Sequence, residues 1–509
     1  MKKCKVIENL IITAVIIISL LWIGSIKYGF HIDEIWTFHL ANYQYNDTLG
    51  IANFDIVDGR SYTGETLWDN YMTVQPEHRF DYKNVWVNQA ADVHPPLYYC
   101  LIHTICSFFP NQCEAWMGLI LNVLLAAVIF WQVRWMFERF LKDEKCSNII
   151  SFIFMFSVGF INAISFFRMY VLLMVWTNAL VILLLDDCDR NNSWKFYGKL
   201  YLIIFGGMMT QYYYSIFTCF ICAIYAVYVW KDKNYQKILL STLTIASSVM
   251  TEIVIFPAML KHIFQSGRGK EAFSNIHADG FMEHLFQFLK IINVQLFGGQ
   301  IIIVLFIALF ILAMGGHINR NIELTKIFMK KYLLVLFPTI IYILFIAKLA
   351  PYRDIRYLMN ILALVYVLIA SLIYYTLKNV VGLKAGAASI ILLLLIIIGY
   401  KTGIPNFRLS EKENVVQLEK MKDVPCVYFY DEKYKWNIAA NILELRKLDE
   451  ISFFELNSDD ITINDKAIVY VMRGSDDETV LSKLMKYNTH LTKKEKLFQS
   501  GYSTVYYLN

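Results

Sequence analysis

The fold class of this chain is decided by a long uncharged run, residues 200–230, which has the sequence LYLIIFGGMMTQYYYSIFTCFICAIYAVYVW. The run is longer than the roughly 20 apolar residues that one transmembrane helix needs. The polar cluster Thr210-Gln211-Tyr212 divides it into two shorter segments. We therefore predict two membrane-spanning helices that meet at a polar break.

Segments of the same kind recur along most of the chain. Further apolar runs lie at about 10–26, 116–136, 149–165, 170–186, 238–257, 301–316, 333–349, 357–377 and 386–400. Together with the divided run they predict a polytopic α-helical membrane protein with about eleven transmembrane helices. The first run follows Met1-Lys2-Lys3-Cys4-Lys5, exceeds a signal-peptide core and lacks an A-x-A-like cleavage site. We expect it to be a retained anchor with its N-terminus inside.

The composition supports this class and excludes two others. Of 509 residues, 57% are hydrophobic and only 17% are charged, against about 25% charged in a soluble domain. A soluble globular protein is therefore excluded. The net charge of +5 is not gathered into a basic patch with interleaved aromatic residues, so nucleic acid is not an expected partner. The nine cysteines are scattered and predict no disulfide framework.

Charge also divides the chain. From residue 405 onward 32 of 105 residues are charged, against 57 of the 404 before them. We predict a membrane domain over residues 1–404 and a soluble domain over 405–509. The tail has strand-like strings at 426–430, 451–456 and 467–472 and helix-like stretches at 434–447 and 477–487. It therefore predicts a small α/β module.

Orientation follows from the lysines and arginines of the short loops. They fall on the side of the N-terminus in the connections near residues 139–145, 190–199, 231–237, 320–331 and 378–384. By the positive-inside rule this side is cytoplasmic. The long loop 28–115 and the tail then lie outside. The run 96–109 is short and bounded by proline, which indicates a re-entrant or interfacial helix within the outer loop.

Two adjacent carboxylates, Asp33 and Glu34, follow the first span in the string His31-Ile32-Asp33-Glu34. Acidic residues favour the first turn of any helix, because they complement its dipole there. Two neighbours on a helix point about 100° apart, so they cannot serve one atom equally. One would act as a base and the other as an orienting or structural group.

The far end of the outer loop carries the string Asp92-Val93-His94-Pro95-Pro96-Leu97-Tyr98-Tyr99. The two prolines fix the entry into the next helix and keep the residues before them extended. This brings Asp92 and His94 back toward the membrane surface, or it simply stiffens a helix start. No metal-ligand spacing accompanies His94, so we predict no metal site there.

Three arginines stand at the outer ends of spans. They are Arg168, between two spans, and Arg353 and Arg356 in the string Pro351-Tyr352-Arg353-Asp354-Ile355-Arg356-Tyr357. Interfacial arginines can simply extend to water, and Arg353 has a local partner in Asp354. Guanidinium groups also bind phosphate bidentately. If they converge, they predict a site for an anionic lipid headgroup.

These strings together resemble the bacterial members of glycosyltransferase family 39. That family groups with the protein O-mannosyltransferases and aminoarabinose transferases of the GT-C membrane fold. The resemblance covers about residues 7–400 and is carried by Asp33-Glu34, the HPPLYY string 94–99, Arg168-Met169-Tyr170 and Arg356-Tyr357-Leu358. Gln211 stands where relatives often have histidine. The tail resembles an added domain and transfers no chemistry.

The resemblance implies an enzyme that transfers a sugar from a polyprenyl-phosphate donor to a glycan, lipid or protein acceptor on the outer face of the membrane. Asp33 would be the general base, and Glu34 would orient it or bind the sugar. Arg168, Arg356 and Arg353 would hold the lipid phosphate, and direct displacement would invert the anomeric centre. The sugar and acceptor would be bound by a further set of residues, namely Asp92, His94, Tyr98, Gln211, Tyr212 and Tyr213. No cofactor is implied, although the contiguous carboxylates leave a divalent cation open.

Two other functions use some of the same features. A transporter or flippase for a lipid-linked glycan would use the outward arginines, but it should show internal repeats and ionisable residues near mid-membrane. No clear repeat is present, and Glu252 lies close to the outer end of its run. A non-catalytic assembly protein of the cell envelope would tolerate replacement of Asp33.

Overall fold

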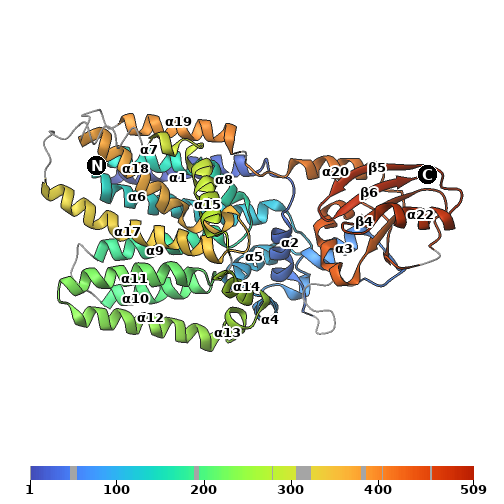
Figure 1. Cartoon of the computed structure of the whole chain (residues 1–509), viewed down its shortest axis with the longest axis horizontal. Helices are drawn as coiled ribbons and strands as arrows, with labels where there is room; N and C mark the ends of the chain where they lie inside the picture. The colour runs from blue at the N-terminus through green and yellow to red at the C-terminus, as the bar shows by residue number, and fades with distance from the viewer. Residues whose placement is uncertain are drawn as a thin grey trace. The chain divides into compact units, whose positions relative to one another are not determined.

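The computed structural model describes residues 2–45, 54, 56–187, 194–277, 279–304, 322–379, 386–403, 405–458 and 461–509. Two compact units make up the chain (Figure 1). The first, which we call the membrane unit, contains residues 1–24, 93–98 and 119–406. The second, which we call the sheet unit, contains residues 25–92, 99–118 and 407–509.

The membrane unit is entirely helical in its described part. Its helices are α1 (Lys2–Gly24), α6 (Ala115–Leu141, from residue 119), α7 (Glu144–Met155), α8 (Val158–Ser165), α9 (Tyr170–Asp187), α10 (Trp194–Met208), α11 (Tyr214–Lys231), α12 (Tyr235–Ile255), α13 (Ala258–Phe264), α14 (Gly267–Asn275), α15 (Phe281–Phe297), α17 (Ile322–Leu349), η2 (Ile355–Tyr357), η3 (Met359–Ile361), α18 (Leu362–Asn379) and α19 (Gly386–Thr402). Figure 1 shows α9, α10, α11 and α12 side by side.

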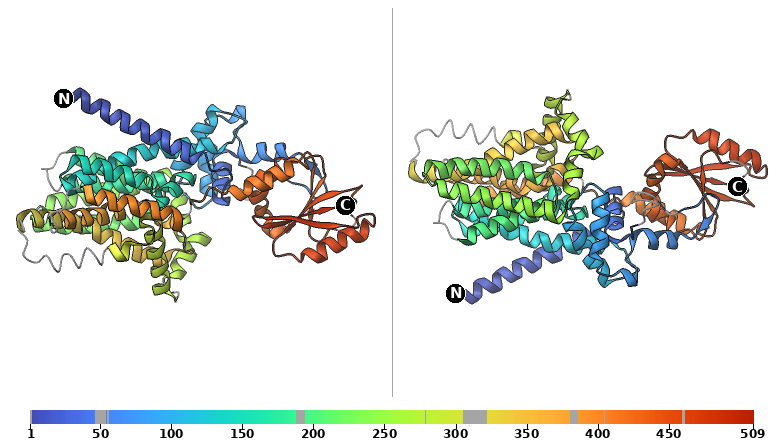
Figure 2. Two further views of the ribbon diagram at one scale, coloured as in Figure 1. Left: turned by 90° about the horizontal axis from the view of Figure 1, so that it is seen from above. Right: turned by 90° about the horizontal axis from the view of Figure 1, so that it is seen from below.

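Seven described helices are long and apolar enough to cross a membrane, or eight if the bent pair α7 and α8 is one span. The chain is therefore a multi-pass membrane protein. Helices α10 and α19 are shorter, with 15 and 17 residues, and most of the predicted span 301–316 lies outside the described residues. The first span has only 11% of its residues buried, and Figure 2 shows the dark blue α1 standing apart from its bundle over its N-terminal part.

The divided run forms the break that the sequence predicts. Helix α10 ends at Met208 and α11 begins at Tyr214, with Thr210 and Gln211 between them. A second break bends the chain by 58° between α7 and α8. There the Ser157 side chain accepts a hydrogen bond from the backbone N–H of Phe160 and starts a new helix. Both breaks bring polar backbone and side chains to helix ends.

The sheet unit combines the outer loop with the C-terminal tail. From the loop come α2 (Ile32–Asn42), β1 (Ser61–Tyr62), α3 (Gly64–Met72), η1 (Pro76–His78), α4 (Tyr82–Ala91) and most of α5 (Leu97–Phe108). From the tail come α20 (Leu409–Glu419), β2 (Cys426–Tyr430), η4 (Glu432–Asn441), α21 (Ile442–Leu445), β3 (Ile451–Glu455), β4 (Ala467–Met472), α22 (Asp477–Tyr487), β5 (Lys494–Ser500) and β6 (Ser503–Leu508).

The six strands form one sheet in the order β1-β3-β2-β4-β6-β5. Strands β3, β2 and β4 are parallel, with Cys426 opposite Ile451 and Ile468, and the other pairs are antiparallel. All five residues of β2 are buried, as expected for a parallel strand covered on both faces. The predicted α/β module is confirmed; the hairpin of β5 and β6 and the helix α20 were not predicted.

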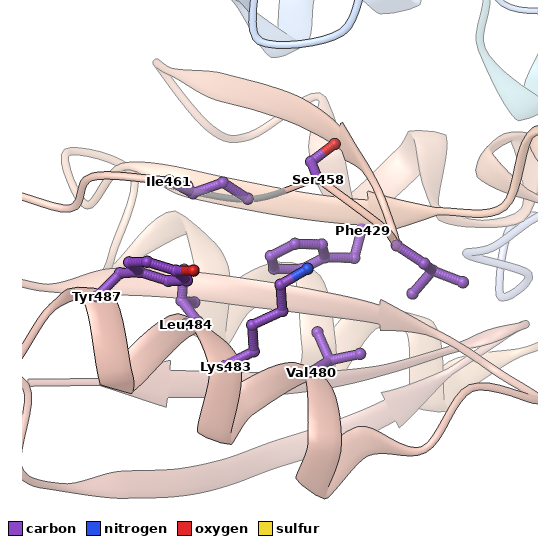
Figure 3. A pocket seen from close by; sticks show the side chains of 8 residues that line it. Phe429, Ser458, Ile461, Val480, Lys483, Leu484 and Tyr487 are labelled. Carbon is purple, nitrogen blue, oxygen red and sulfur yellow. The ribbon is translucent and has the colours of Figure 1, made fainter.

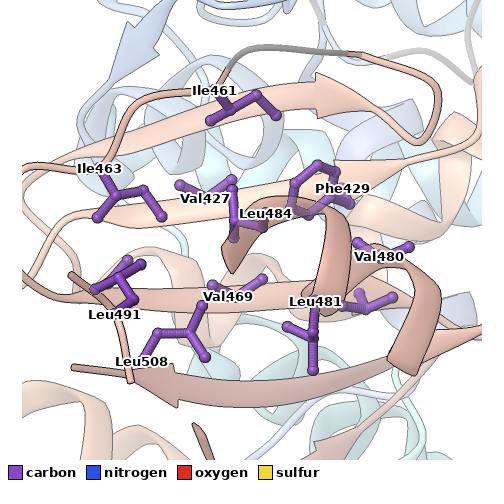
Figure 4. Close-up of a cluster of buried hydrophobic side chains, with 12 residues drawn as sticks. Val427, Phe429, Ile461, Ile463, Val469, Val480, Leu481, Leu484, Leu491 and Leu508 are labelled. Atoms are coloured by element: carbon purple, nitrogen blue, oxygen red, sulfur yellow. The ribbon is translucent and has the colours of Figure 1, made fainter. Parts of the chain in front are cut away.

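Alternate residues of the strands enter two different layers. Val427, Phe429, Val469 and Val471 pack under α22, whose Leu481 is fully buried (Figure 4). On the opposite face the Tyr428 and Tyr470 rings stack, with centroids 5.2 Å apart. Their hydroxyls donate to Asn441 Oδ1 and Glu444 Oε2 of the η4 and α21 layer. The module therefore has a helical layer on each face of its sheet.

The compact units divide the chain differently from the predicted domains. The membrane unit ends at Asn406, close to the predicted boundary after residue 404. The outer loop, however, groups with the tail and not with the membrane helices. The reason is pairing: β1 extends the sheet beside β3, and the backbone N–H of Gly64 donates to Leu448 O at 2.9 Å. These contacts join segments far apart in the sequence, so composition does not predict them.

Candidate functional site

Arg168 lies in the turn between α8 and α9 and is only 5% exposed. Its Nη2 is 3.4 Å from His94 Nε2. The segment that carries His94 is tied to the end of α10, because Leu97 N–H donates to Met209 O at 3.1 Å. The membrane unit therefore brings Arg168 and His94 together, beside the break that holds Gln211.

Hydrogen bonds from α6 fix the turn that carries Arg168. The Asn122 amide of α6 donates to the carbonyls of Ile164 and Phe166, at 3.0 and 3.1 Å, where α8 ends. Tyr98 is fully buried and its hydroxyl donates to Asn122 Oδ1 at 3.1 Å. Tyr98 therefore lies next to the residue that bonds the turn of Arg168.

The break between α10 and α11 carries Gln211, Tyr212 and Tyr213. Gln211 is 8% exposed and its Oε1 accepts the N–H of Tyr212. The Tyr212 hydroxyl is 2.9 Å from Nδ1 of the buried His262 in α13. Burial raises the pKa of the Tyr213 hydroxyl to about 12, so it remains protonated near neutral pH.

The remaining two arginines precede α18 and have different environments. Arg356 lies against the rings of Tyr352 and Tyr357, at 5.4 and 5.3 Å from their centroids. The Tyr357 ring is in turn 6.0 Å from that of Tyr213, at the α10–α11 break. Arg353 turns instead toward α15, with Nη2 2.5 Å from His284 Nε2 and Nη1 3.8 Å from Glu283. A chain of contacts within the membrane unit thus links Arg356 to the break that Arg168 adjoins.

Asp33 and Glu34 lie in the sheet unit, in the first turn of α2. Glu34 is fully buried, and its Oε2 accepts hydrogen bonds from Lys27 Nζ at 2.9 Å and from His31 N–H at 2.6 Å. Asp33 has 27% of its side chain exposed, with Oδ2 3.6 Å from His31 Nδ1. The two neighbours therefore have different environments: Glu34 is buried in an ion pair, and Asp33 is partly exposed.

Asp92 lies in the sheet unit as the residue that ends α4, and it is half-buried. Its neighbours in sequence, from Val93 onward, belong to the membrane unit. The predicted residues thus form two groups. Arg168, His94, Gln211, Tyr212, Tyr213 and Arg356 make a polar rim of the membrane unit, whereas Asp33, Glu34 and Asp92 belong to the sheet unit.

Two hollows in the described part of the chain are lined by residues outside the predicted site. A cavity of about 180 Å³ between α9, α10, α11 and α12 is lined by Leu184, Leu200, Cys222, Ala223, Tyr225, Ala226, Ile238, Ser241, Thr242 and Ile245, with no charged side chain. A cleft of about 10 Å³ beside α22, with Phe429, Lys483 and Tyr487 at its walls, has room for about one water molecule (Figure 3). The cavity has no charged side chain for a phosphate, and the cleft is too small to hold one.

Sequence reasoning missed three residues that shape this site. Lys27 is the buried partner of Glu34, His262 is the partner of Tyr212, and Asn122 holds the Arg168 turn. Only Lys27 had a signal in the sequence, because it stands seven residues before Glu34 at the end of the first span. Among the described residues no group of three or more His, Cys, Asp or Glu side chains is placed to hold a metal ion.

Comparison with known proteins identifies the fold. No family model and no curated protein matches this sequence. The crystal structure of ArnT from Cupriavidus metallidurans bound to undecaprenyl phosphate matches with a TM-score of 0.50 and 8% identity, over 97% of each chain. The apo structure of the same protein gives a TM-score of 0.38 at 10% identity, over 93% of this chain and 95% of that one. ArnT is a GT-C glycosyltransferase, and this chain has the GT-C fold that was predicted.

Proposed function

We propose that this protein transfers a sugar from a polyprenyl-phosphate-linked donor to an acceptor at the outer face of the membrane. The observation that carries the proposal is the rim of the membrane unit, where Arg168 is 95% buried beside His94 at the end of two spans. A cation buried in a membrane protein is costly and usually functional. The ArnT structure, which has the same fold, holds undecaprenyl phosphate.

The rim suits a lipid phosphate. Arg168 and Arg356 offer planar donor groups that match phosphate oxygens. Tyr213 adds a protonated hydroxyl, since burial keeps its pKa high. We assign Arg353 a smaller part, because it contacts His284 and Glu283 on α15. Charge grows on the phosphate as it leaves, so these groups stabilise the transition state more than the ground state.

Asp33 supplies the base in this proposal. Its carboxylate takes the proton of an acceptor hydroxyl, whose oxygen attacks the anomeric carbon while the bond to the phosphate oxygen breaks. The bonding pair leaves with the polyprenyl phosphate, and the anomeric centre inverts. A carboxylate needs only reach and a suitable pKa for this role. Asp33 lies in the first turn of α2, where an acidic side chain complements the helix dipole.

The family-39 resemblance fits this proposal through Asp33-Glu34, the HPPLYY string and the two Arg-Tyr pairs. We infer from it the outward orientation, with the N-terminus cytoplasmic and the tail extracytoplasmic. His94, Gln211 and Tyr212 are the proposed contacts to sugar or acceptor. Asp92 is the proposed contact from the sheet unit.

The test is consumption of radiolabelled polyprenyl-phosphate sugars by the purified full-length protein in liposomes. Asp33→Asn should lower turnover about 10²- to 10⁴-fold while donor binding survives. Arg168→Ala should instead weaken binding of the polyprenyl phosphate. Glu413→Gln, an exposed position on α20, is the matched control for a lost carboxylate.

Two outcomes would reverse the assignment. Turnover at the wild-type rate by the Asp33→Asn variant would show that Asp33 is not the general base. Movement of the donor between leaflets without sugar release would favour a flippase. Glu252, which is fully buried three residues before the end of α12, is an acid that such a transporter would use.

A further inference from the structure

The start of α2 is supported by a helix from the other end of the chain. Helix α20 opens the tail module, and within the sheet unit it lies against residues 28–30. Tyr28 N–H donates to Phe407 O at 3.1 Å. Phe30 N–H donates to Glu411 Oε2 at 2.9 Å. Two of the residues just before α2 are therefore held by backbone hydrogen bonds to the tail.

Glu411 approaches this segment so closely that a side chain at position 29 would displace its carboxylate. A Cβ atom on Gly29 would lie 1.7 Å from Glu411 Oε2, far inside van der Waals contact. Because glycine has no Cβ atom, the Glu411 carboxylate can approach the backbone closely. The side chain of Glu411 is only 17% exposed, so its charge is largely withdrawn from water.

Two cations accompany the Glu411 carboxylate. Arg408, which precedes α20, bonds Glu411 Oε1 through its Nε. The ammonium of Lys27 also acts on Glu411, because it lowers the pKa that burial otherwise raises. Lys27 is the residue that holds Glu34 at 2.9 Å. Lys27 therefore bonds Glu34 and acts on Glu411 through its charge.

The backbone at Arg408 shows that this arrangement is maintained at a cost. Arg408 has φ 51° and ψ 39°, the left-handed region. A non-glycine residue is strained in this region and persists there only when its surroundings enforce it. The Arg408–Glu411 pair lies directly beside the loop that carries the candidate base.

We propose that Glu411 is a positioning residue for the sugar transfer: it fixes the backbone at Phe30 and, with Lys27 and Glu34, the start of α2 that aims Asp33. The inference rests on the proposed function of Asp33. It gives the tail module a part in the reaction, as the element that holds the catalytic loop. The rate of such a reaction falls about 100-fold when a reacting group is misplaced by about 1 Å.

The experiment compares Glu411→Ala, Glu411→Gln and the control Glu413→Gln in the full-length protein in liposomes. Glu411→Ala should lower kcat about 10- to 100-fold and leave KM for the polyprenyl-phosphate sugar within about twofold. Glu411→Gln keeps an oxygen for Phe30 N–H and should stay within about threefold of wild type. Glu413→Gln should be unchanged. If Glu411 contributed to stability alone, its replacement would not lower kcat while leaving KM nearly unchanged.

A second measurement does not need turnover. Hydrogen exchange of the amides in residues 28–34 should speed up in Glu411→Ala and stay at the wild-type rate in Glu413→Gln. Unchanged kcat in Glu411→Ala, or unchanged exchange, would overturn the inference. A wild-type protein that consumes no donor would defeat the proposed function, and the exchange rates would still decide whether Glu411 fixes the loop.

Should Glu411→Ala fail to fold, Gly29→Ala tests the same contact from the other side. Its Cβ would displace the Glu411 carboxylate, so kcat should again fall while the protein remains folded. Normal kcat in a folded Gly29→Ala protein would count against the proposal.

Discussion

Charged side chains have different surroundings in the polar rim of the membrane unit and around the start of α2 in the sheet unit. In the rim, Arg356 lies against aromatic rings and Arg168 beside an imidazole. In the sheet unit, Glu34 at the start of α2 is fully buried and bonded to Lys27, and Glu411 of α20 is bonded to Arg408. Asp33 has 27% of its side chain exposed and lies 3.6 Å from His31 Nδ1.

The difference separates ligand binding from support. A guanidinium among rings and imidazoles keeps a positive field that an anionic phosphate can use. A carboxylate bonded to a buried lysine and to a backbone amide has its charge already balanced by the protein. We infer that the rim binds the lipid phosphate, whereas the ion pairs of Glu34 and Glu411 position the start of α2, which carries Asp33.

The largest expected effect comes from breaking the Lys27–Glu34 pair. Lys27→Met leaves the Glu34 carboxylate buried beside an apolar side chain, and this should cost about 3–5 kcal/mol of unfolding free energy. Thermal unfolding in detergent measures the loss. The double variant Lys27→Met/Glu34→Gln should be more stable than Lys27→Met alone. If the two single losses simply add in the double variant, the pair is not coupled.

The next effect distinguishes the two neighbouring arginines. Arg356→Gln should raise KM for the polyprenyl-phosphate sugar about 10- to 100-fold, because a hydrogen bond to a charged group contributes about 1.5–3 kcal/mol. Arg353→Gln should change KM less than about threefold, since Arg353 contacts His284 and Glu283. Steady-state kinetics with a fixed acceptor decides this, and equal effects would contradict the separation.

A smaller effect concerns the junction of outer loop and tail within the sheet unit. Arg446 forms two bonds to Glu65, at 3.0 and 3.1 Å, one to Glu114 at 3.2 Å, and lies over the Trp68 ring at 4.6 Å. Arg446→Lys cannot keep the bidentate pair and should lower stability by about 1–2 kcal/mol. Differential scanning fluorimetry is the measurement. Lys447→Arg, on the neighbouring residue, should have no effect.

The smallest effect is a pH dependence from Glu444, which accepts hydrogen bonds from Ser500, Asn414, Asn441 and Tyr470. Burial raises its pKa, so the folded protein holds this proton more tightly than the unfolded chain. Stability from this group therefore falls as pH rises through the raised pKa. The melting temperature of wild type relative to Glu444→Gln should rise when the pH is lowered from 7 to 5. A difference that is constant with pH would contradict the assignment.

Several features were predictable because they depend on local pattern. The break at Gln211, the bounds of β2 and β4 and the helix α22 follow from apolar runs and alternation, which act over a few residues. The buried state of Arg168 was not visible, since it depends on Asn122, 46 positions away in the sequence. The different environments of Arg353 and Arg356, three residues apart, likewise depend on α15 and on two tyrosine rings.

By itself the sequence determined the class of this protein: a multi-pass membrane chain with a charged α/β tail and polar strings at span ends. Hydrophobic burial in lipid is a property of single segments, so composition suffices to show it. Only the tertiary structure decided which of two adjacent carboxylates is fully buried and which is partly exposed, and that the outer loop shares a sheet with the tail. Those outcomes rest on Lys27, Glu411 and the β1–β3 pairing, contacts between distant segments that no local pattern encodes.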